Sequence, residues 1–168
     1  MHQEISNNIV ILGSSGVGKS AITVAFVNRQ STPQGWEAHT SMTVDGKQHS
    51  VSITIEQDEF VAMREQYIKQ GDGFIFLYSI TDFKSFTSLS NHLQTFYRSC
   101  DSRRKPIMIV GNKTDLEDQR KVSYRAGASL AGVLDCNFME VSASTGKGIK
   151  DMLSVIIREI TRAKKNRR

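Results

Sequence analysis

Three stretches of the chain are apolar at nearly every position: residues 8–13 (NIVILG), 73–80 (GFIFLYSI) and 106–112 (PIMIVGN). A strand that is buried on both faces has this composition, because both of its alternating sets of side chains need apolar neighbours. Sequence with helical periodicity follows each stretch, and residues 136–142 repeat the strand pattern in a shorter form. This strand–helix order predicts a mostly parallel sheet covered by helices.

The pattern changes before the second of these stretches. Val51, Ile53 and Ile55 alternate with polar residues, and Asp45-Gly46 just upstream is a strong hairpin-turn signal. The sequence therefore predicts an antiparallel hairpin at the edge of the sheet. Helices are expected over residues 18–28, 123–134 and 148–164, the last with one apolar stripe that we interpret as core packing.

The formal charge of +5 is concentrated at one end of the chain. Five basic and no acidic residues follow Thr161, and without these five the chain has 17 basic and 17 acidic residues. We therefore divide the chain into one domain, residues 1–161, and a basic tail, residues 162–168. A neutral body argues against binding to nucleic acid, while the tail is either simply solvated or attracted to anionic lipid.

The sequence carries no signal for export or membrane insertion. No apolar run approaches the roughly 18 residues of a membrane span, and residues 1–8 are polar rather than a secretion signal. Cys100 and Cys136 have no C-x-x-C spacing, which favours free thiols in a reducing compartment. We expect a cytoplasmic protein, or one at the cytoplasmic face of a membrane if the tail binds lipid.

The first candidate for chemistry is GSSGVGKS, residues 13–20, between a predicted strand and a predicted helix. It matches the phosphate-binding loop G-x-x-x-x-G-K-[ST], in which glycines let backbone N–H groups turn toward phosphate oxygens at the positive end of a helix. Lys19 would reach the β- and γ-phosphates, and the hydroxyl of Ser20 would bind Mg²⁺. The alternative, a glycine-rich turn without a ligand, is weak because the flanking elements are also in place.

A second motif, GNKTD at residues 111–115, decides the base. It follows a predicted buried strand, so it lies at the carboxyl end of the sheet, where open α/β sheets bind ligands. The Asp115 carboxylate can accept hydrogen bonds from N1–H and the 2-amino group of guanine, two donors that adenine does not present together. Asn112 and Lys113 would brace the loop, and residues 142–144 (SAS) would bring a backbone N–H to the guanine oxygen.

With these motifs in this order, the sequence resembles the Ras superfamily of small GTPases and, within it, the Ras family. The resemblance rests on GSSGVGKSAIT, QDEFVAMREQYIKQGDGFIFLYSIT, VGNKTDL and EVSAS, and it covers nearly the whole chain. It implies the α/β P-loop NTPase fold: a six-stranded, mostly parallel sheet with one antiparallel edge strand, flanked by five helices. It also implies GTP/GDP and Mg²⁺ as ligands, and effector, exchange-factor and activating proteins as partners through two switch segments.

The same resemblance assigns the nucleotide-binding positions. They are Gly13, Ser15, Gly16, Val17, Gly18, Lys19, Ser20, Ala21, Asn112, Lys113, Asp115, Leu116, Ser142, Ala143 and Ser144. Lys19 and Gln57 are the candidate catalytic residues, since Gln57 matches the glutamine that orients the attacking water in this family.

The second switch departs from the family pattern. Family members carry D-T-A-G-Q at the end of the third strand, and alignment through AMREQY places Ile53 at the aspartate and Glu56 at the glycine. Loss of the aspartate removes an outer-shell contact to Mg²⁺, typically worth 10- to 100-fold in metal affinity. At about 5 Å from a γ-phosphate, a Glu56 carboxylate would add roughly 3 kcal/mol of repulsion per unit charge at an effective dielectric near 20, unless it faces solvent.

The first switch is shorter than the family pattern and has no Pro-Thr pair for Mg²⁺. Thr40 is the candidate metal ligand, with Thr32 and Thr43 as alternatives, and Trp36 either covers the base or only packs the loop. Ser15 stands where most members have glycine, and Ser144 replaces a lysine that packs on the base. Together with the altered second switch, these changes predict slow hydrolysis.

Three hypotheses follow. The first is a Ras-like GTPase that acts as a signalling switch. The second is a pseudo-GTPase, an interaction module that holds GDP permanently or no nucleotide. The third, an ATP-dependent kinase, is disfavoured by NKTD. Ras-family proteins commonly end in a prenylated cysteine, whereas AKKNRR has none. Either the sequence is trimmed or membrane association depends on the basic tail.

Overall fold

A computed structural model describes residues 4–27, 37–55, 61–99 and 105–168. The strands are β1 (Ile5–Leu12), β2 (Glu37–Val44), β3 (Lys47–Ile55), β4 (Gly73–Ser79), β5 (Ile107–Asn112) and β6 (Asn137–Glu140). The helices are α1 (Lys19–Phe26), α2 (Val61–Gln70), α3 (Phe83–Thr87), α4 (Leu89–Ser99), η2 (Thr114–Gln119, a 3-10 helix), α5 (Tyr124–Leu134) and α6 (Ile149–Asn166). None of the helices in these described ranges is long and apolar enough to cross a membrane.

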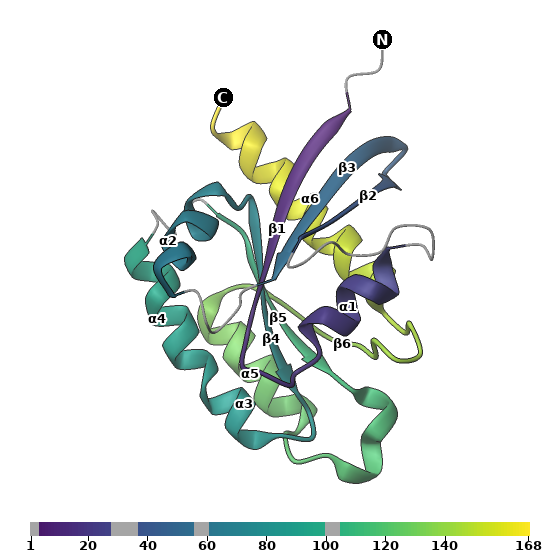
Figure 1. Cartoon of the computed structure of the whole chain (residues 1–168), viewed down its shortest axis with the longest axis vertical. Helices are drawn as coiled ribbons and strands as arrows, with labels where there is room; N and C mark the ends of the chain where they lie inside the picture. Colours follow the sequence, from purple (N-terminus) through teal and green to yellow (C-terminus); the bar gives the residue numbers. More distant parts are fainter. Residues whose placement is uncertain (1–3, 28–36, 56–60, 100–104) are drawn as a thin grey trace.

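The six strands form one sheet in the order β2-β3-β1-β4-β5-β6 (Figure 1). All neighbouring pairs are parallel except β2 and β3, which are antiparallel. The predicted fold class, a mostly parallel six-stranded sheet with one antiparallel edge strand, is therefore confirmed. Because β1 lies in the middle, between β3 and β4, the segment that follows it emerges at the centre of the carboxyl end, where such sheets bind ligands.

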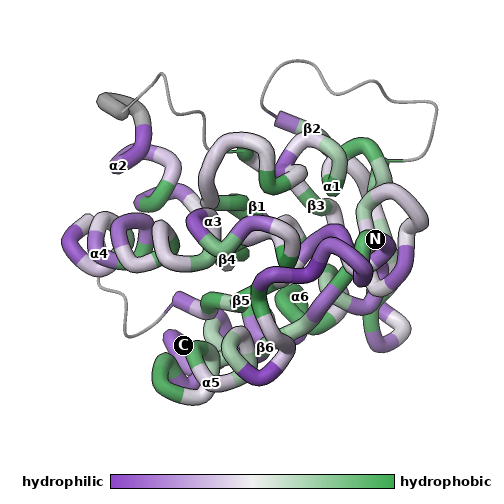
Figure 2. Tube along the Cα trace, turned by 90° about the horizontal axis from the view of Figure 1, so that it is seen from below, coloured by the Kyte–Doolittle hydropathy of each residue, from purple (hydrophilic) through white to green (hydrophobic). Residues whose placement is uncertain are grey.

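Both faces of the sheet are buried, which explains the continuous apolar runs. In β1, Ile9 and Ile11 belong to the core on the face of α1 and α6, while Val10 and Leu12 belong to the core on the face of α2, α4 and α5. Figure 2 shows these helix layers on the two sides of the strands. The same alternation continues in β4, where every residue is buried.

The Asp45-Gly46 turn closes the β2–β3 hairpin as expected. Both residues have positive φ, 50° and 74°, the combination that a two-residue hairpin turn with right-handed strand twist requires. The turn fixes the register, so that Thr40 lies opposite Val51 and Glu37 opposite Thr54.

Two features differ from the expected boundaries. The helix expected after β4 is divided at Ser88 into α3 and α4, and the side chain of Asp82 caps α3 by accepting from the N–H of Lys84. The helix α6 runs to Asn166, so residues 162–166 of the expected basic tail continue the last helix of the domain.

Tyr78 is an aromatic residue of the core whose hydroxyl has no hydrogen-bond partner among the described residues. Its side chain is buried. Burial is the main cause that raises the pKa of Tyr78 above its ordinary value, so the phenol stays neutral. The hydroxyl lies against Gly127 of α5, where a β-carbon would collide with it.

Replacing Tyr78 with phenylalanine should therefore raise the free energy of unfolding by about 1 kcal/mol, because an unpaired buried hydroxyl costs roughly 1–3 kcal/mol. Denaturant unfolding measures the change. Tyr124→Phe is the matched control, because Tyr124 is 60% exposed and its loss of a hydroxyl should have no effect. A loss of stability in Tyr78→Phe would instead show that the hydroxyl makes a stabilising hydrogen bond.

Candidate functional site

The loop of residues 13–20 joins β1 to α1 at the carboxyl end of the sheet (Figure 1). Gly16 and Gly18 have φ of 83° and 100°, a backbone region that favours glycine. Gly18 is the N-cap of α1, and neither a side-chain cap nor an acidic residue occupies the first turn. The free N–H groups and the positive end of this helix therefore suit an anion.

Two glycines of the loop are required by close packing. A β-carbon at Gly13 would collide with the carbonyl oxygen of Leu77 in β4, and one at Gly18 would collide with Nδ2 of Asn112 in β5. Both neighbours are held by the sheet, so neither can retreat easily. The loop thus packs against the carboxyl ends of β4 and of β5, the strand that leads into the base-recognition motif.

Lys19 folds back across the loop. Its ammonium donates to the carbonyl oxygen of Gly13 and, at 3.5 Å, to that of Ser14. The positive charge therefore lies against the backbone of the phosphate loop.

Asn112 connects the two halves of the site. It is 1% exposed, its Nδ2 donates to the carbonyl oxygen of Val17 at 2.9 Å, and its Oδ1 accepts from the N–H of Ala143 at 3.0 Å. One side chain thus ties the phosphate loop to the loop after β6. Loss of a buried amide with two such bonds typically leaves unpaired groups on both sides.

Lys113 makes a second link. Its ammonium donates to the carbonyl oxygen of Gly16 at 2.8 Å. Its own φ is 71°, an unusual conformation for a residue with a side chain, and such strain is often retained where a side chain must be aimed. Lys113 therefore ties the segment after β5 to the phosphate loop.

Asp115 lies in η2 with an exposed carboxylate, and the hydroxyl of Ser142 donates to its Oδ1 at 2.8 Å. This hydrogen bond is the largest of the causes that hold the pKa of Asp115 below its ordinary value, with Ser144 and Lys113 adding to it. The carboxylate is therefore ionised at neutral pH, as acceptance of two hydrogen bonds from guanine requires.

Replacing Ser142 with alanine should raise the pKa of Asp115 toward its ordinary value, because the largest stabilising contact is removed while Ser144 remains. A carboxyl-detected NMR titration measures the change. Glu117 is an internal control, because Arg120 is what lowers its pKa. An Asp115 pKa that stays unchanged would assign the lowering to other groups.

One support of the site was not found from the sequence. Arg120, directly after η2, donates to the carboxylates of both Glu117 and Glu140, at 2.7–2.8 Å. The pair with Glu140 joins the end of η2 to β6 and so holds Asp115 near Ser142. No spacing in the sequence indicates a contact between residues 120 and 140, so only the fold could reveal it.

The candidate magnesium ligands are not brought together. Ser20 is exposed in the first turn of α1, whereas Thr40 lies opposite Val51, which in turn lies opposite Asn7 of β1. Asn7 is six residues before Gly13, a distance of about 20 Å along a strand. The assignment of Thr40 to the metal is thus not supported. Thr43 is farther along β2, and Thr32 lies outside the described residues.

The candidates of the second switch are only partly described. Gln57 and Glu56 lie outside the described residues, as does Trp36. Ile53 is fully buried inside β3, opposite Ile9, and the strand continues to Ile55, opposite Ile11. The carboxyl end of β3 is thus formed by Ile55 rather than Ile53.

The remaining positions surround the same loops. Val17 is buried beneath the phosphate loop, while Ser15 and Ala21 are exposed on it. Leu116 is half-buried in η2, and the Ser144 hydroxyl lies 3.4 Å from that of Ser142.

Among the described residues around the phosphate loop, Ser20 is the candidate donor for magnesium. The described residues contain no group of three or more histidine, cysteine, aspartate or glutamate side chains that could hold a metal. A single hydroxyl is nevertheless compatible with Mg²⁺, which in nucleotide sites is held largely by phosphate oxygens and water.

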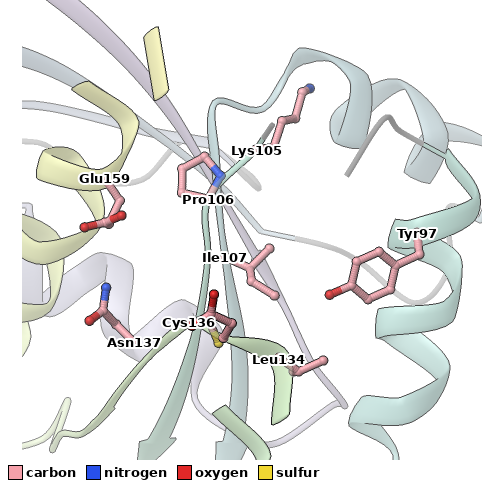
Figure 3. Close-up of a pocket in the computed structure, with 9 residues that line it drawn as sticks. Tyr97, Lys105, Pro106, Ile107, Leu134, Cys136, Asn137 and Glu159 are labelled. Carbon is pink, nitrogen blue, oxygen red and sulfur yellow. The ribbon is translucent and has the colours of Figure 1, made fainter. Parts of the chain in front are cut away.

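A cavity of about 540 Å³ lies elsewhere, at the amino ends of β5 and β6. Figure 3 shows Tyr97 and Glu159 on opposite sides of it, with Ile107 and Cys136 between them. Burial raises the pKa of the Cys136 thiol to about 11, so this thiol is not an activated nucleophile. The cavity is at the end of the sheet opposite the phosphate loop and takes no part in the nucleotide site.

Comparison with known proteins agrees with this geometry. The model of the Ras family matches residues 8–162. The mouse GTP-binding protein Rit2 is 39% identical over 161 residues, which cover 92% of this chain and 74% of that protein. The mouse GTP-binding protein Rit1 is 38% identical over 164 residues (94% and 75%), and the Ras-like protein rasX of Dictyostelium discoideum is 36% identical over 167 residues (94% and 78%).

Proposed function

The chain belongs to the Ras family of small GTPases, and from this premise we propose that it binds GDP and GTP with Mg²⁺ and acts as a signalling switch with slow hydrolysis. Its partners would be the effector, exchange-factor and activating proteins that such a switch requires. The similar proteins Rit2 and Rit1 carry the description GTP-binding, which supports the nucleotide assignment.

The observation that carries the proposal is the double role of Asn112. A side chain that bonds both the phosphate loop and the loop after β6 couples the binding of phosphates to the binding of the base. Around it, Lys19 and the N–H groups of the loop would bind the phosphates, Ser20 would bind Mg²⁺, and Asp115 would select guanine. Bound Mg²⁺ would supply neutralisation of the phosphate charge during transfer.

Slow hydrolysis is proposed from the residues around the site. The carboxyl end of β3 carries Ile55, an apolar residue that offers nothing to a metal-bound water. Ser15 is an exposed side chain on the phosphate loop at a position where most family members have glycine, and it would crowd an attacking water or an incoming arginine. We retain Gln57 as the residue that would orient the water.

The runner-up, a pseudo-GTPase that does not switch, is favoured by the same Ile55. If the missing carboxylate weakens Mg²⁺ enough, GTP would lose more affinity than GDP, because its γ-phosphate depends more on the cation. Such a protein would hold GDP or no nucleotide, and its function would lie in its surface.

The nucleotide content of the purified protein distinguishes the two. The protein is denatured, its supernatant is analysed by ion-exchange chromatography, and exchange and single-turnover hydrolysis are then followed with added GTP and Mg²⁺. We expect bound GDP, uptake of GTP, and cleavage slower than that of Rit2 measured alongside. An empty protein, or GDP that GTP never replaces, would favour the pseudo-GTPase, and cleavage as fast as that of Rit2 would contradict slow hydrolysis.

A carboxylate introduced at the end of β3 tests whether its absence there weakens the binding of Mg²⁺. Ile55→Asp should tighten Mg²⁺-dependent retention of nucleotide by about tenfold, the lower end of the effect of an outer-shell ligand group. Mant-GDP dissociation over a Mg²⁺ titration measures it. In the control Ile53→Asp, a carboxylate in the fully buried core should instead lower stability, without tightening Mg²⁺. If only Ile53→Asp retained nucleotide more tightly, residue 53 rather than residue 55 would correspond to the aspartate of the family pattern.

A further inference from the structure

A second pocket, of about 200 Å³, lies between the β2–β3 hairpin and the last turns of α6. Four of its eight lining residues are lysine or arginine. It is lined by Val44, Asp45, Lys47, His49, Arg158, Thr161, Arg162 and Lys165. Residues more than 100 positions apart in the sequence thus form one small, positively charged hollow, which the pattern of the sequence did not predict.

The positive charge of this hairpin–helix pocket is only partly compensated. Asp45 accepts hydrogen bonds from the Arg158 guanidinium at 3.0–3.2 Å. Glu159 accepts one from Arg162 at 2.7 Å. Within the part of the chain that the structure describes, the ammonium groups of Lys47 and Lys165 have no hydrogen bond or ion pair. Two arginines are therefore oriented by carboxylates, and two lysines are left to attract an anion.

His49, at the base of the pocket, responds to this charge. The side chain is 2% exposed, and its Nδ1 lies 3.0 Å from Nδ2 of Asn7. Burial is the main cause that lowers the pKa of His49, and the charges of Lys164 and Lys47 lower it further, against a smaller opposite effect of Asp45. The ring is thus neutral at physiological pH. The lysines lower its pKa more than Asp45 raises it, so the electrostatic potential at the ring is positive.

The size and donors of the pocket indicate the ligand. At about 200 Å³ it is smaller than the roughly 300–1,000 Å³ of sites for drug-sized ligands, so it suits one compact charged group. The two lysines bind phosphate as point charges, and a guanidinium that pairs with a carboxylate can still donate to phosphate through its remaining N–H groups. A phosphate ester meets both conditions, because each monoester carries about −1.5 to −2 charges and three acceptor oxygens.

The position of the pocket indicates where this phosphate comes from. His49 lies opposite Ile5, at the start of β1, and Gly13 follows the other end of that strand, about 25 Å away. Figure 1 shows the hairpin turn and the last turns of α6 at this end of the molecule, away from the loop between β1 and α1. A flat anionic surface at the pocket would therefore leave the nucleotide site facing away from it.

We propose that the hairpin–helix pocket binds the phosphate ester of a phosphoinositide headgroup at a membrane surface, with the basic turns of α6 resting on the surrounding anionic lipid. The pocket differs from a diffuse basic tail because it selects a headgroup rather than only a charge density. The inference does not depend on the nucleotide state of the protein.

Binding to two kinds of phosphatidylcholine vesicles tests the proposal. One kind contains phosphatidylinositol bisphosphate, and the other contains phosphatidylserine at the amount that gives the same zeta potential. Co-flotation of the full chain should show tighter binding to the phosphoinositide vesicles. Lys47→Ala and Lys165→Ala should each reduce that binding about fivefold, the effect of one lysine near an anionic membrane, and should reduce or remove the preference.

Arg168→Ala is the matched control, because Arg168 is an exposed basic residue near the same end of the chain but outside the pocket. It should weaken binding to both kinds of vesicle equally and leave the preference intact. Equal binding of the unaltered protein to the two kinds, or a preference that survives both lysine substitutions, would overturn the proposal. If soluble inositol trisphosphate bound as tightly as the vesicles, the ligand would be a soluble phosphate ester and the membrane assignment would be wrong.

Discussion

Replacing Lys19 with alanine should lower the affinity for both GDP and GTP by about 100-fold or more. The ammonium of Lys19 reaches over the phosphate loop and is held by the carbonyl oxygens of Gly13 and Ser14. With a nucleotide, it would exchange these contacts for charged phosphate oxygens. Hydrogen bonds to charged groups contribute about 1.5–3 kcal/mol each, so two of them account for at least two orders of magnitude.

Competition between labelled and unlabelled nucleotide at fixed Mg²⁺ measures this loss. Lys150→Ala is the control, because Lys150 is an exposed lysine in the first turn of α6 and makes no contact with the loop. It should bind nucleotide as the unaltered protein does. If Lys19→Ala kept its GDP affinity within about threefold, a difference of only about 0.7 kcal/mol, the loop would not be the phosphate site.

The elements that the sequence predicted best are those whose pattern has one physical cause. In β1, β4 and β5, burial on both faces demands continuous apolar sequence, and the Asp45-Gly46 turn demands positive φ at two positions that these residues tolerate. Residues 13–20 follow β1 and GNKTD lies at the end of β5, positions that could be predicted for a similar reason. Each motif is a short local geometry that follows a strand, so the sheet needs only to bring the strand ends together.

For Thr40 and Ile53, the sequence did not predict the position along the strand. Both were assigned by matching positions to a family pattern across loops of altered length. In the fold, the hairpin turn sets the register of β2 and β3 against β1, and that register leaves Thr40 level with Asn7 and Ile53 level with Ile9. The register of a strand depends on the lengths of the loops before and after it. An alignment anchored only on the segment after β3 does not reveal the length of the loop between that segment and β3.

The contact between Arg120 and Glu140 could not be predicted from the sequence for a different reason. Its two residues belong to separate elements, and a charged pair of this kind has no periodicity or spacing of its own. The hairpin–helix pocket is similar, since Lys47 and Lys165 meet only through the packing of α6 beside the hairpin. Sites made from one segment can be read from sequence, whereas sites made between segments need the fold.

Replacing Asp115 with asparagine should change which base the protein binds. The carboxylate is the acceptor for two guanine donors, and its ionised form is stabilised by Ser142. An asparagine of the same shape offers one acceptor and one donor, so the 2-amino group of guanine would meet an N–H. Loss of two charged hydrogen bonds, at about 1.5–3 kcal/mol each, predicts a fall in GDP affinity of roughly 100- to 10,000-fold.

Xanthine carries a carbonyl oxygen where guanine carries that amino group, and the new amide can donate to it. Asp115→Asn should therefore bind xanthosine diphosphate more tightly than GDP, while the unaltered protein shows the reverse order. Asp118→Asn makes the same chemical change at an exposed residue of the same segment, η2, and should keep the preference for guanine. Because the phosphate loop is untouched in both variants, a loss of both nucleotides in Asp115→Asn would mean that Asp115 supports the fold of the loop rather than the choice of base.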